Sequence, residues 1–197
     1  IYYMSLNYGG MEVFLADTTG KVNLLSGSQP QLDGLKLSEN GKKAAYLDTD
    51  ANTGDTILVE IELGKEKAET VATNVQSFGY IGNTLIYYFD YTEGVGTLGA
   101  AGSKTTIANA SGVQFTEDAV YYVADADAAT GNGELRAWDG KTETAIAKDV
   151  FAFQYKENGK LVYIGKYDVN AGVGDLYYYD GKEARKLDTG ITAIFIY

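Results

Sequence analysis

Residues Leu161–Ile191, LVYIGKYDVNAGVGDLYYYDGKEARKLDTGI, contain the pattern that decides the fold. An apolar run is followed by an Asp/Gly-rich segment, a Tyr-rich run, an Asp-Gly turn and a last polar run. Short runs of β-branched and aromatic residues separated by Gly, Asp and Asn are typical of β-strands joined by turns. Because the same order recurs along the chain, we expect a repeat architecture built from strands.

The most regular marker of the repeat is a turn with glycine and lysine that follows a strand-like run. It occurs at Gly20, Gly64, Gly102, Gly140 and Gly181, with a serine before the lysine in the third copy. These glycines are 44, 38, 38 and 41 residues apart, and the interval across the joined chain ends is 36. Four-stranded propeller blades repeat at about 40–45 residues. The spacing therefore predicts blades of four strands each.

The two ends of the chain complement each other. Residues 1–27 look like the second, third and fourth strands of a blade, and residues 192–197 look like a first strand. Pairing them would close the ring and remove an open sheet edge. We therefore predict one all-β domain, 1–197, folded as a five-bladed β-propeller. Its blades are 1–31 with 192–197, 32–75, 76–112, 113–150 and 151–191.

Two other architectures fit the same strand pattern. The segment could be a piece of a longer blade array, with both sheet edges unpaired. It could also be a β-sandwich or another non-radial all-β fold. Helix content is expected to be negligible, because no stretch has a helical period of apolar residues.

Composition excludes several function classes. The chain has no cysteine and no histidine, which rules out disulfides, Cys/His zinc sites and a Ser–His catalytic pair. Its net charge of −11 opposes binding to nucleic acid or to anionic lipid. No window approaches 18 consecutive apolar residues, so we expect no membrane insertion by this segment. The segment lacks a basic-then-apolar leader, so an export signal would lie outside it.

Two stretches carry a family resemblance. SENGKKAAYLDTDANTGDTILVEI, from Ser38, and KENGKLVYIGKYDVNAGVGDLYYYDGK, from Lys156, resemble TolB-type, WD-like propeller repeats of bacterial proteins. They also resemble Tyr-rich propeller domains of Gram-positive surface proteins and lipoproteins. Units 76–112 and 113–150 depart from the Ser-x-Asn-Gly-Lys form. The resemblance implies a propeller fold and an extracellular or cell-surface location in bacteria, and it brings no catalytic residue set.

The loops between the second and third strands of each blade are expected on one propeller face. We place these loops at 48–55, 90–96, 125–134 and 167–175. Together these loops hold ten acidic residues and no basic residue. The acids are Asp48, Asp50, Asp55, Asp90, Glu93, Asp125, Asp127, Glu134, Asp168 and Asp175. We therefore predict a strongly acidic face around the propeller channel.

One of these loops resembles a cation site. Asp48, Asp50, Asn52 and Asp55 place oxygen ligands at a spacing that calcium loops use. However, Gly54 falls one position late for an EF-hand and no bidentate Glu follows it. Solvated Asp/Gly turn chemistry is the alternative. Calcium is thus the one cofactor that the sequence suggests, and otherwise none is expected.

Catalytic motifs find little support. The run from Gly94 to Gly99 matches the dinucleotide pattern Gly-x-Gly-x-x-Gly, but a strand-like rather than helical sequence follows it. Glycosidases of five-bladed propeller type need two carboxylates about 5–10 Å apart. The expected inner strands contain no acid. The sequence therefore favours a protein that is not an enzyme, with a carboxylate-based glycan-processing enzyme as the alternative.

Aromatic side chains are the remaining candidates for a binding surface. Exposed aromatic rings can anchor a protein partner or stack on a ligand. We select Tyr80, Tyr91 and Tyr167, which would lie near the channel mouth. The leading hypothesis is a monomeric, non-catalytic binding or scaffold module of a larger chain, with an unknown protein or glycan ligand. A purely structural spacer is a third possibility.

Overall fold

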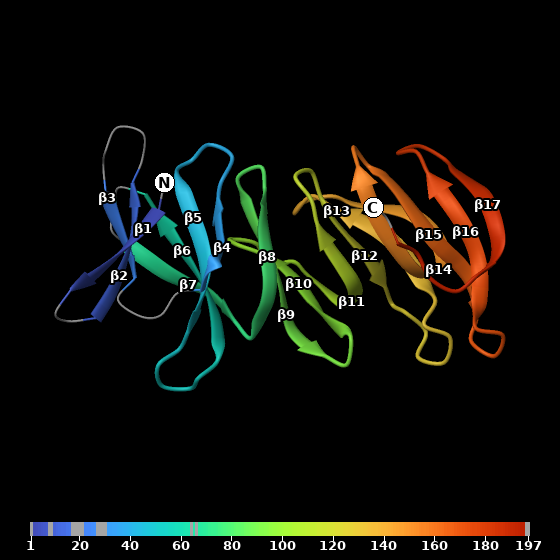
Figure 1. The fold of residues 1–197 in the computed structure, drawn as a ribbon, viewed down its shortest axis with the longest axis horizontal. Helices are drawn as coiled ribbons and strands as arrows, with labels where there is room; N and C mark the ends of the chain where they lie inside the picture. The colour runs from blue at the N-terminus through green and yellow to red at the C-terminus, as the bar shows by residue number, and fades with distance from the viewer. Residues whose placement is uncertain are drawn as a thin grey trace. The chain divides into compact units, whose positions relative to one another are not determined.

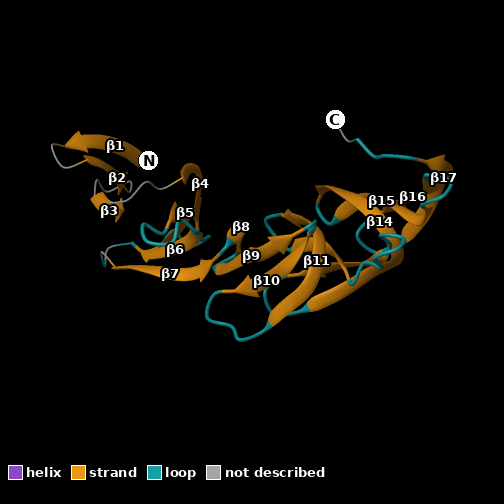
Figure 2. Ribbon diagram, turned by 90° about the horizontal axis from the view of Figure 1, so that it is seen from below, coloured by secondary structure: helices purple, strands orange, loops and turns teal. Residues whose placement is uncertain are grey.

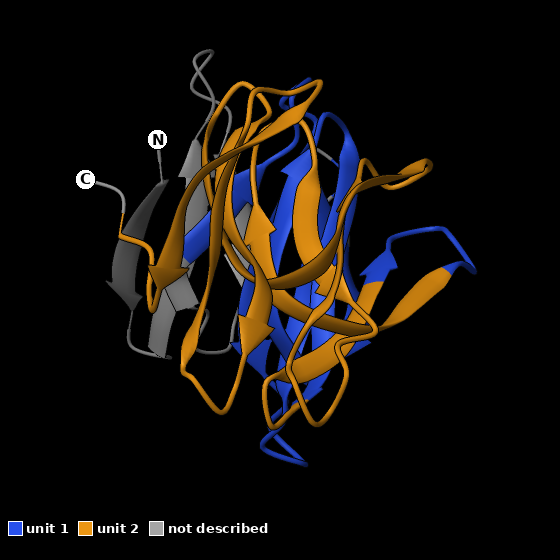
Figure 3. Ribbon diagram, turned by 90° about the vertical axis from the view of Figure 1, so that its right-hand side faces the viewer, with its two compact units in different colours: residues 1–91, 99–105 blue, residues 92–98, 106–197 orange. Residues whose placement is uncertain are grey.

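The chain is built from strands and turns. The computed structural model describes residues 2–7, 10–16, 22–26, 31–63, 65 and 67–195, and its side chains from residue 34 onward, that of Lys67 excepted. Figure 2 draws this part as strands and loops, and it holds no helix that could cross a membrane. The all-β prediction is confirmed for these residues. Two compact units divide the chain: residues 1–91 with 99–105, and residues 92–98 with 106–197 (Figure 3).

The first unit contains antiparallel sheets whose strands follow the chain. One three-stranded sheet consists of β1 (Tyr2–Asn7), β2 (Gly10–Ala16) and β3 (Val22–Ser26). One four-stranded sheet consists of β4 (Gln31–Leu37), β5 (Lys43–Thr49), β6 (Thr56–Glu62) and β7 (Lys67–Thr73). The strands β8 (Val75–Ile81) and β9 (Thr84–Thr92) follow and pair as an antiparallel hairpin (Figure 1).

The second unit holds a series of antiparallel strands, each paired with the next. They are β11 (Thr106–Phe115), β12 (Val120–Ala124), β13 (Gly133–Trp138), β14 (Glu143–Glu157), β15 (Lys160–Asp168), β16 (Val173–Tyr179) and β17 (Ala184–Ile191). The short strand β10 (Val95–Ala100) contains residues of both units. Strand order from β8 to β17 follows the chain, so each strand is the sequence neighbour of its partner.

Strand β14 shows how one group of four strands leads into the next. Its first half pairs with β13 and its second half pairs with β15, and Val150 is the residue at which the partner changes. Asp149, directly before it, has a φ of 55°. This left-handed conformation is uncommon for residues other than glycine, and Asn and Asp tolerate it best. The strand therefore turns at Asp149 and serves two neighbouring groups.

The same turn recurs at Asn74 and Asn109, both with a φ of 55°. The Asn74 side-chain amide donates to Asp90 Oδ1 (3.3 Å), and the Asn109 amide donates to Asp125 Oδ1 (3.2 Å). In each pair the backbone N–H of the aspartate also donates to the asparagine carbonyl at 3.1 Å. The repeat in the sequence is thus reproduced as a repeat in backbone geometry.

Alternating side chains form the core in both units. In β5, Ala44 and Tyr46 point to one cluster with Val59 and Ile61, while Ala45 faces a second cluster. In the second unit, Tyr121, Val123, Leu135, Phe153, Leu161 and Tyr163 form a buried cluster across β12 to β15. This period of two is the pattern expected of strands with both sheet faces covered.

All four expected loops are shorter than the sequence suggested, because the connections are residues 50–55, 93–94, 125–132 and 169–172. The segment 90–96 was expected to be a loop, but Asp90 lies within β9 and the connection to β10 is the pair Glu93–Gly94. Their φ values of 51° and 92° give the left-handed two-residue turn that fits the twist of a β-hairpin. The glycines of the Gly-x-Gly-x-x-Gly pattern therefore belong to a hairpin and to strand β10.

Ring closure stays a prediction. Residues 192–195 belong to no strand, and residues 196 and 197 lie outside the described residues. Described strands supply three members, β1 to β3, to the first sheet. The division into five blades also stays a prediction: 1–31 with 192–197, 32–75, 76–112, 113–150 and 151–191. The four-stranded sheet of β4 to β7 covers almost the same residues as the predicted blade 32–75.

Candidate functional site

Two irregularities in paired strands bring Phe151 and Tyr167 together. The register of β14 and β15 shifts between Val150 and Ala152, which leaves Phe151 as an extra residue. In β15 the register with β16 shifts between Gly165 and Asp168, and Lys166 has a φ of 54°. Bulges of this kind bend a strand and redirect its side chains. Phe151 follows Asp149 and Tyr167 follows Lys166, two residues with positive φ. Both aromatic side chains therefore lie outside the regular strand pairing, where they stack on each other.

The two rings form a partly exposed stack, which we call the aromatic platform. Their centroids are 3.9 Å apart and their planes are inclined by 9°. Phe151 is 36% exposed, and Tyr167 is half-buried. Large aromatic side chains usually bury most of their surface in a core. An accessible, ordered pair of rings is thus the feature of this unit that is best suited to contact another molecule.

A glycine makes room for the platform. Gly131 has a φ of 71°, and a Cβ atom at this position would lie 3.0 Å from Phe151 Cε2. A side chain here would be strained by the backbone conformation and would also push against the ring. The loop between β12 and β13 therefore depends on glycine where it contacts Phe151.

Side-chain hydrogen bonds fix the loops next to the platform. Asn132 donates through Nδ2 to the Tyr167 carbonyl (2.9 Å) and accepts from the Tyr167 N–H through Oδ1 (3.3 Å). Asp127 Oδ1 accepts from the N–H groups of residues 129 and 130, at 3.0 and 2.8 Å. Asp168 Oδ1 accepts likewise from Asn170 N (2.9 Å). The platform is consequently attached to two loops with defined conformations rather than to loose chain.

The acids selected as calcium ligands are occupied by their own loop. Asp50 Oδ1 accepts from Asn52 N (2.8 Å) and Thr53 N (3.1 Å), and these hydrogen bonds lower the pKa of Asp50. Asp48 is buried and its Oδ1 accepts from the N–H of the next residue. Within the described ranges no group of three metal-ligating side chains comes together. The Asp50 N–H also donates to the Asp55 backbone carbonyl at 2.9 Å, and the calcium set of Asp48, Asp50, Asn52 and Asp55 stays a prediction.

The three selected tyrosines have different environments. Tyr80 donates its hydroxyl to Glu60 Oε1 (2.8 Å), and burial together with this hydrogen bond raises the pKa of Tyr80 strongly. Tyr91 is 46% exposed and meets Tyr88 edge to face, with centroids 5.8 Å apart. Of the three, Tyr167 is the one that stacks with a second exposed ring. Tyr80 is therefore part of the packing of its unit, Tyr91 is exposed, and Tyr167 is half-buried.

The proposed acidic face is partly neutralised by basic side chains on neighbouring strand positions. Glu134 pairs with Arg136, whose Nε donates to Glu134 Oε2 at 2.6 Å. Asp175 pairs with Lys186 at 2.7 Å, which lowers the pKa of Asp175. Asp90 and Asp125 accept from the junction asparagines, and Glu93 lies in the two-residue turn between β9 and β10. The acidic face as a whole stays a prediction.

A four-residue polar cluster lies in the second unit. Glu143 Oε1 accepts from Tyr122 Oη and from Arg136 Nη1, both at 2.5 Å, and Arg136 also pairs with Glu134. Burial, reinforced by Glu143, raises the pKa of Tyr122 strongly. Burial opposes ionisation of Glu143, but hydrogen bonds from Arg136 and Tyr122 outweigh it and lower the pKa of Glu143. Tyr122 is fully buried and joins this cluster to the core, while the side chains of Arg136 and Glu143 are about a third exposed.

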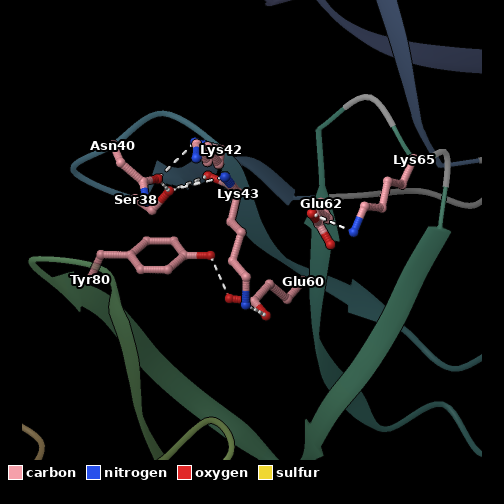
Figure 4. A network of polar contacts seen from close by, with 8 residues as sticks. All are labelled: Ser38, Asn40, Lys42, Lys43, Glu60, Glu62, Lys65 and Tyr80. Carbon is pink, nitrogen blue, oxygen red and sulfur yellow. Dashed lines mark hydrogen bonds and ion pairs between the residues drawn. The ribbon is translucent and has the colours of Figure 1, made fainter.

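The first unit has a charged cavity of about 360 Å³, lined by Lys43, Glu60, Glu62, Lys65 and Glu69. Figure 4 shows Lys43 reaching Glu60, which also accepts from Tyr80, and Lys65 beside Glu62. Both ion-pair distances are 2.8 Å. Because each lysine has a glutamate partner, the cavity presents paired charges and is a weaker candidate than the aromatic platform.

Comparison with known proteins identifies the fold. No family model and no curated protein matches the chain. Among solved structures, it is similar to the β-propeller domain of the Trilobed protease from Pyrococcus furiosus, which has an open velcro topology. The TM-score is 0.57 at 12% identity, covering 94% of this chain and 66% of that one. Acylaminoacyl peptidase from Pyrococcus horikoshii gives a TM-score of 0.52 at 14% identity, covering 94% and 37%.

These likenesses show that the chain has a β-propeller fold, as the repeat spacing predicted. TolB from Acinetobacter baumannii is also similar, at a TM-score of 0.45, 13% identity and coverage of 96% and 52%. The chain spans between 26% and 66% of the peptidase and protease chains that it matches. At this level of identity the comparisons speak for the fold alone.

Sequence reasoning missed Phe151. The residue was assigned to an inner strand and given no role beyond packing. A local signal was present: an aromatic residue two positions after Asp149, where Asn74 and Asn109 mark the same junction in earlier repeats. Aligning these junctions, rather than the Gly-Lys turns, would have placed Phe151 outside the regular alternation.

Proposed function

We propose that this chain is a non-catalytic binding or scaffold module of propeller type, which contacts its partner through the aromatic platform. The observation that carries the proposal is the stack of Phe151 on Tyr167, with Phe151 36% exposed at a centroid distance of 3.9 Å. Protein and ligand contact sites are enriched in ordered aromatic side chains of this kind. The fixed loops reduce the entropy lost on binding, because the rings are already held in one arrangement.

The positions of the carboxylates support a role without catalysis. A glycan-processing enzyme needs an acid and a second carboxylate facing one substrate bond. Asp127 and Asp168 instead accept hydrogen bonds from their own loops, and Glu143 is held by Tyr122 and Arg136. Along the described inner half of β14, residues 150–156 contain no acid. These side chains are thereby assigned to turns and packing.

An exported location is the second part of the proposal. It is supported by the resemblance of the Tyr-rich repeats to propeller domains of bacterial surface proteins and lipoproteins. A periplasmic or extracellular scaffold would also tolerate a chain without cysteine, since folding would then depend on no disulfide. Fractionation of cells that produce this protein from its own gene, with an antibody raised against the present chain, tests the location directly.

Binding is tested with variants that remove one ring at a time. Phe151→Ala and Tyr167→Ala are compared with the parent chain in titrations against a panel of neutral oligosaccharides and short peptides, followed by backbone amide NMR. Leu187→Ala is the matched control, because Leu187 is 50% exposed on β17 and lies outside the platform. The proposal expects at least one probe to shift the amides of Gly131 and Gly172, and both ring variants to weaken that binding. Loss of all binding in Leu187→Ala, or no response to any probe, contradicts it.

A further inference from the structure

The charged groups around the aromatic platform indicate what it binds. Three segments meet there: the β12–β13 loop, the turn of β14 before Phe151, and the end of β15 around Tyr167. They contribute four carboxylates and two lysines, namely Asp125, Asp127, Asp149, Asp168, Lys148 and Lys166. The faces of aromatic rings carry partial negative charge. A platform of rings with an excess of carboxylates therefore favours a positively charged ligand.

The carboxylates beside the platform keep capacity for a partner. Asp127 and Asp168 each use Oδ1 to cap their own loop. The capping hydrogen bonds fix the orientation of each carboxylate, and both side chains belong to exposed residues. An ionised carboxylate accepts at two oxygens, so Oδ2 can accept from a second donor. Each of the two loops that meet at the platform thus carries a carboxylate whose orientation its own loop fixes.

We propose that the aromatic platform recognises an arginine side chain of a protein partner, which rests on the proposed function of this site as a binding surface. A guanidinium group is flat and stacks on an aromatic face, while its N–H groups remain directed outward toward carboxylates. Asp127 and Asp168 supply such acceptors on the two loops that flank the rings. An ammonium group is a compact, strongly hydrated charge and gains less from a flat platform.

The test uses the complete chain and a short blocked peptide rich in arginine. Its counterpart carries citrulline, which keeps the shape of arginine without the charge, and a third peptide carries lysine. Amide shifts of Gly131 and Gly172 report on the platform. We expect the arginine peptide to bind at least about fivefold more tightly than the citrulline peptide, with lysine between them. Added salt should weaken the binding.

Variants separate the roles of ring and charge. Phe151→Ala and Tyr167→Ala should weaken arginine-peptide binding about threefold to tenfold, whereas Tyr167→Phe, which keeps the ring, should not. Asp168→Asn keeps the loop-capping oxygen and removes the charge, so it should weaken binding about twofold to fivefold. Leu187→Ala should bind as the parent chain does.

The outcomes distinguish this inference from the proposed function. Equal binding of the arginine and citrulline peptides overturns the inference, as does unchanged binding in Phe151→Ala. If a neutral oligosaccharide binds in a manner that depends on Phe151 while the arginine peptide does not, the platform is a binding site and the arginine assignment is wrong. If neither probe shifts the platform amides, both the assignment and the proposed function fall.

Discussion

Two stacked aromatic pairs lie in the same unit and differ in almost everything except ring geometry. Tyr163 and Tyr177 have centroids 4.9 Å apart and planes inclined by 8°, and Phe151 and Tyr167 have centroids 3.9 Å apart and planes inclined by 9°. Tyr163 is 5% exposed and is the direct cross-strand partner of Tyr177 in the β15–β16 ladder. Phe151 is 36% exposed, and a bulge displaces it from the ladder.

The difference teaches that register, more than residue type, decides the role of an aromatic pair here. A regular cross-strand pair with both sheet faces covered contributes to the core. In the pair on two bulges, local hydrogen bonds hold Tyr167, and Phe151 stays partly accessible, whereas Tyr163 is buried. We therefore assign Tyr163 and Tyr177 to stability and Phe151 and Tyr167 to binding. Each of the following changes tests that assignment.

The largest effect is expected from removing the buried ring. Tyr163→Ala should lower the free energy of unfolding by about 3 kcal/mol, because it deletes a buried aromatic side chain and leaves a cavity. Tyr163→Phe keeps the ring and should lower it by much less. Urea denaturation followed by circular dichroism measures both. A loss below about 1 kcal/mol for Tyr163→Ala would remove the contrast between the two pairs.

A smaller loss is expected where Gln114 connects β11 to β14, the strand that carries Phe151. The side-chain nitrogen Nε2 of Gln114 donates to the Phe153 carbonyl, and its Oε1 accepts from Tyr155 N. Both distances are 3.0 Å. Gln114→Ala leaves two backbone groups without partners and should cost about 2 kcal/mol. Gln114→Glu retains the acceptor for Tyr155 N but sets a carboxylate oxygen against the Phe153 carbonyl, so it should not restore the stability of the unsubstituted chain. Equal stability of Gln114→Ala and the parent chain would contradict this role.

Alkaline pH should weaken the fold through its buried tyrosines. Burial and the neighbouring Tyr177 raise the pKa of Tyr163, and burial also raises the pKa of Tyr88 to about 12. Unfolded tyrosines ionise near pH 10, so stability is full below pH 10 and declines as pH rises further. The expected loss is about 1 kcal/mol between pH 10 and pH 11. Denaturation at pH 9 and pH 11 measures it, and constant stability across that range would show that these rings ionise freely in the fold.

The smallest change in stability is expected at the turn that presents Phe151. Asp149→Val places a β-branched residue at a φ of 55° and should cost about 1 kcal/mol, while Asp149→Asn should be nearly neutral. Because the bulge positions the ring, Asp149→Val should also weaken probe binding more than Asp149→Asn does. Equal binding by the two variants would mean that the turn does not control the platform.

The sequence was informative where alternation and turn chemistry act locally. It predicted an all-β chain and the propeller fold, since strands such as β5 and β15 each carry their own apolar pattern. It was less informative at junctions. The hairpin turn at Glu93–Gly94 and the partner change at Val150 depend on how neighbouring strands align. The alternation of one strand does not contain that information.

The candidate site was predicted only in part. Tyr167 was selected from its place in a loop between strands, but its partner Phe151 was not, because two bulges on separate strands have to coincide. Asp50 was selected as a possible calcium ligand, whereas it accepts hydrogen bonds from the amides of its own loop, as Asp127 does in the corresponding loop. An Asp-x-x-x-Gly spacing serves turn capping and metal binding alike, so the residues alone did not separate these roles.

The most direct test of the account is the free energy of unfolding of Phe151→Ala, measured beside its binding to the arginine peptide. The account predicts unfolding within about 1 kcal/mol of the parent chain, since the ring is exposed, together with weakened binding. A loss of stability as large as that of Tyr163→Ala, with binding unchanged, would show that the exposed stack belongs to the core and would contradict the assignment of the platform.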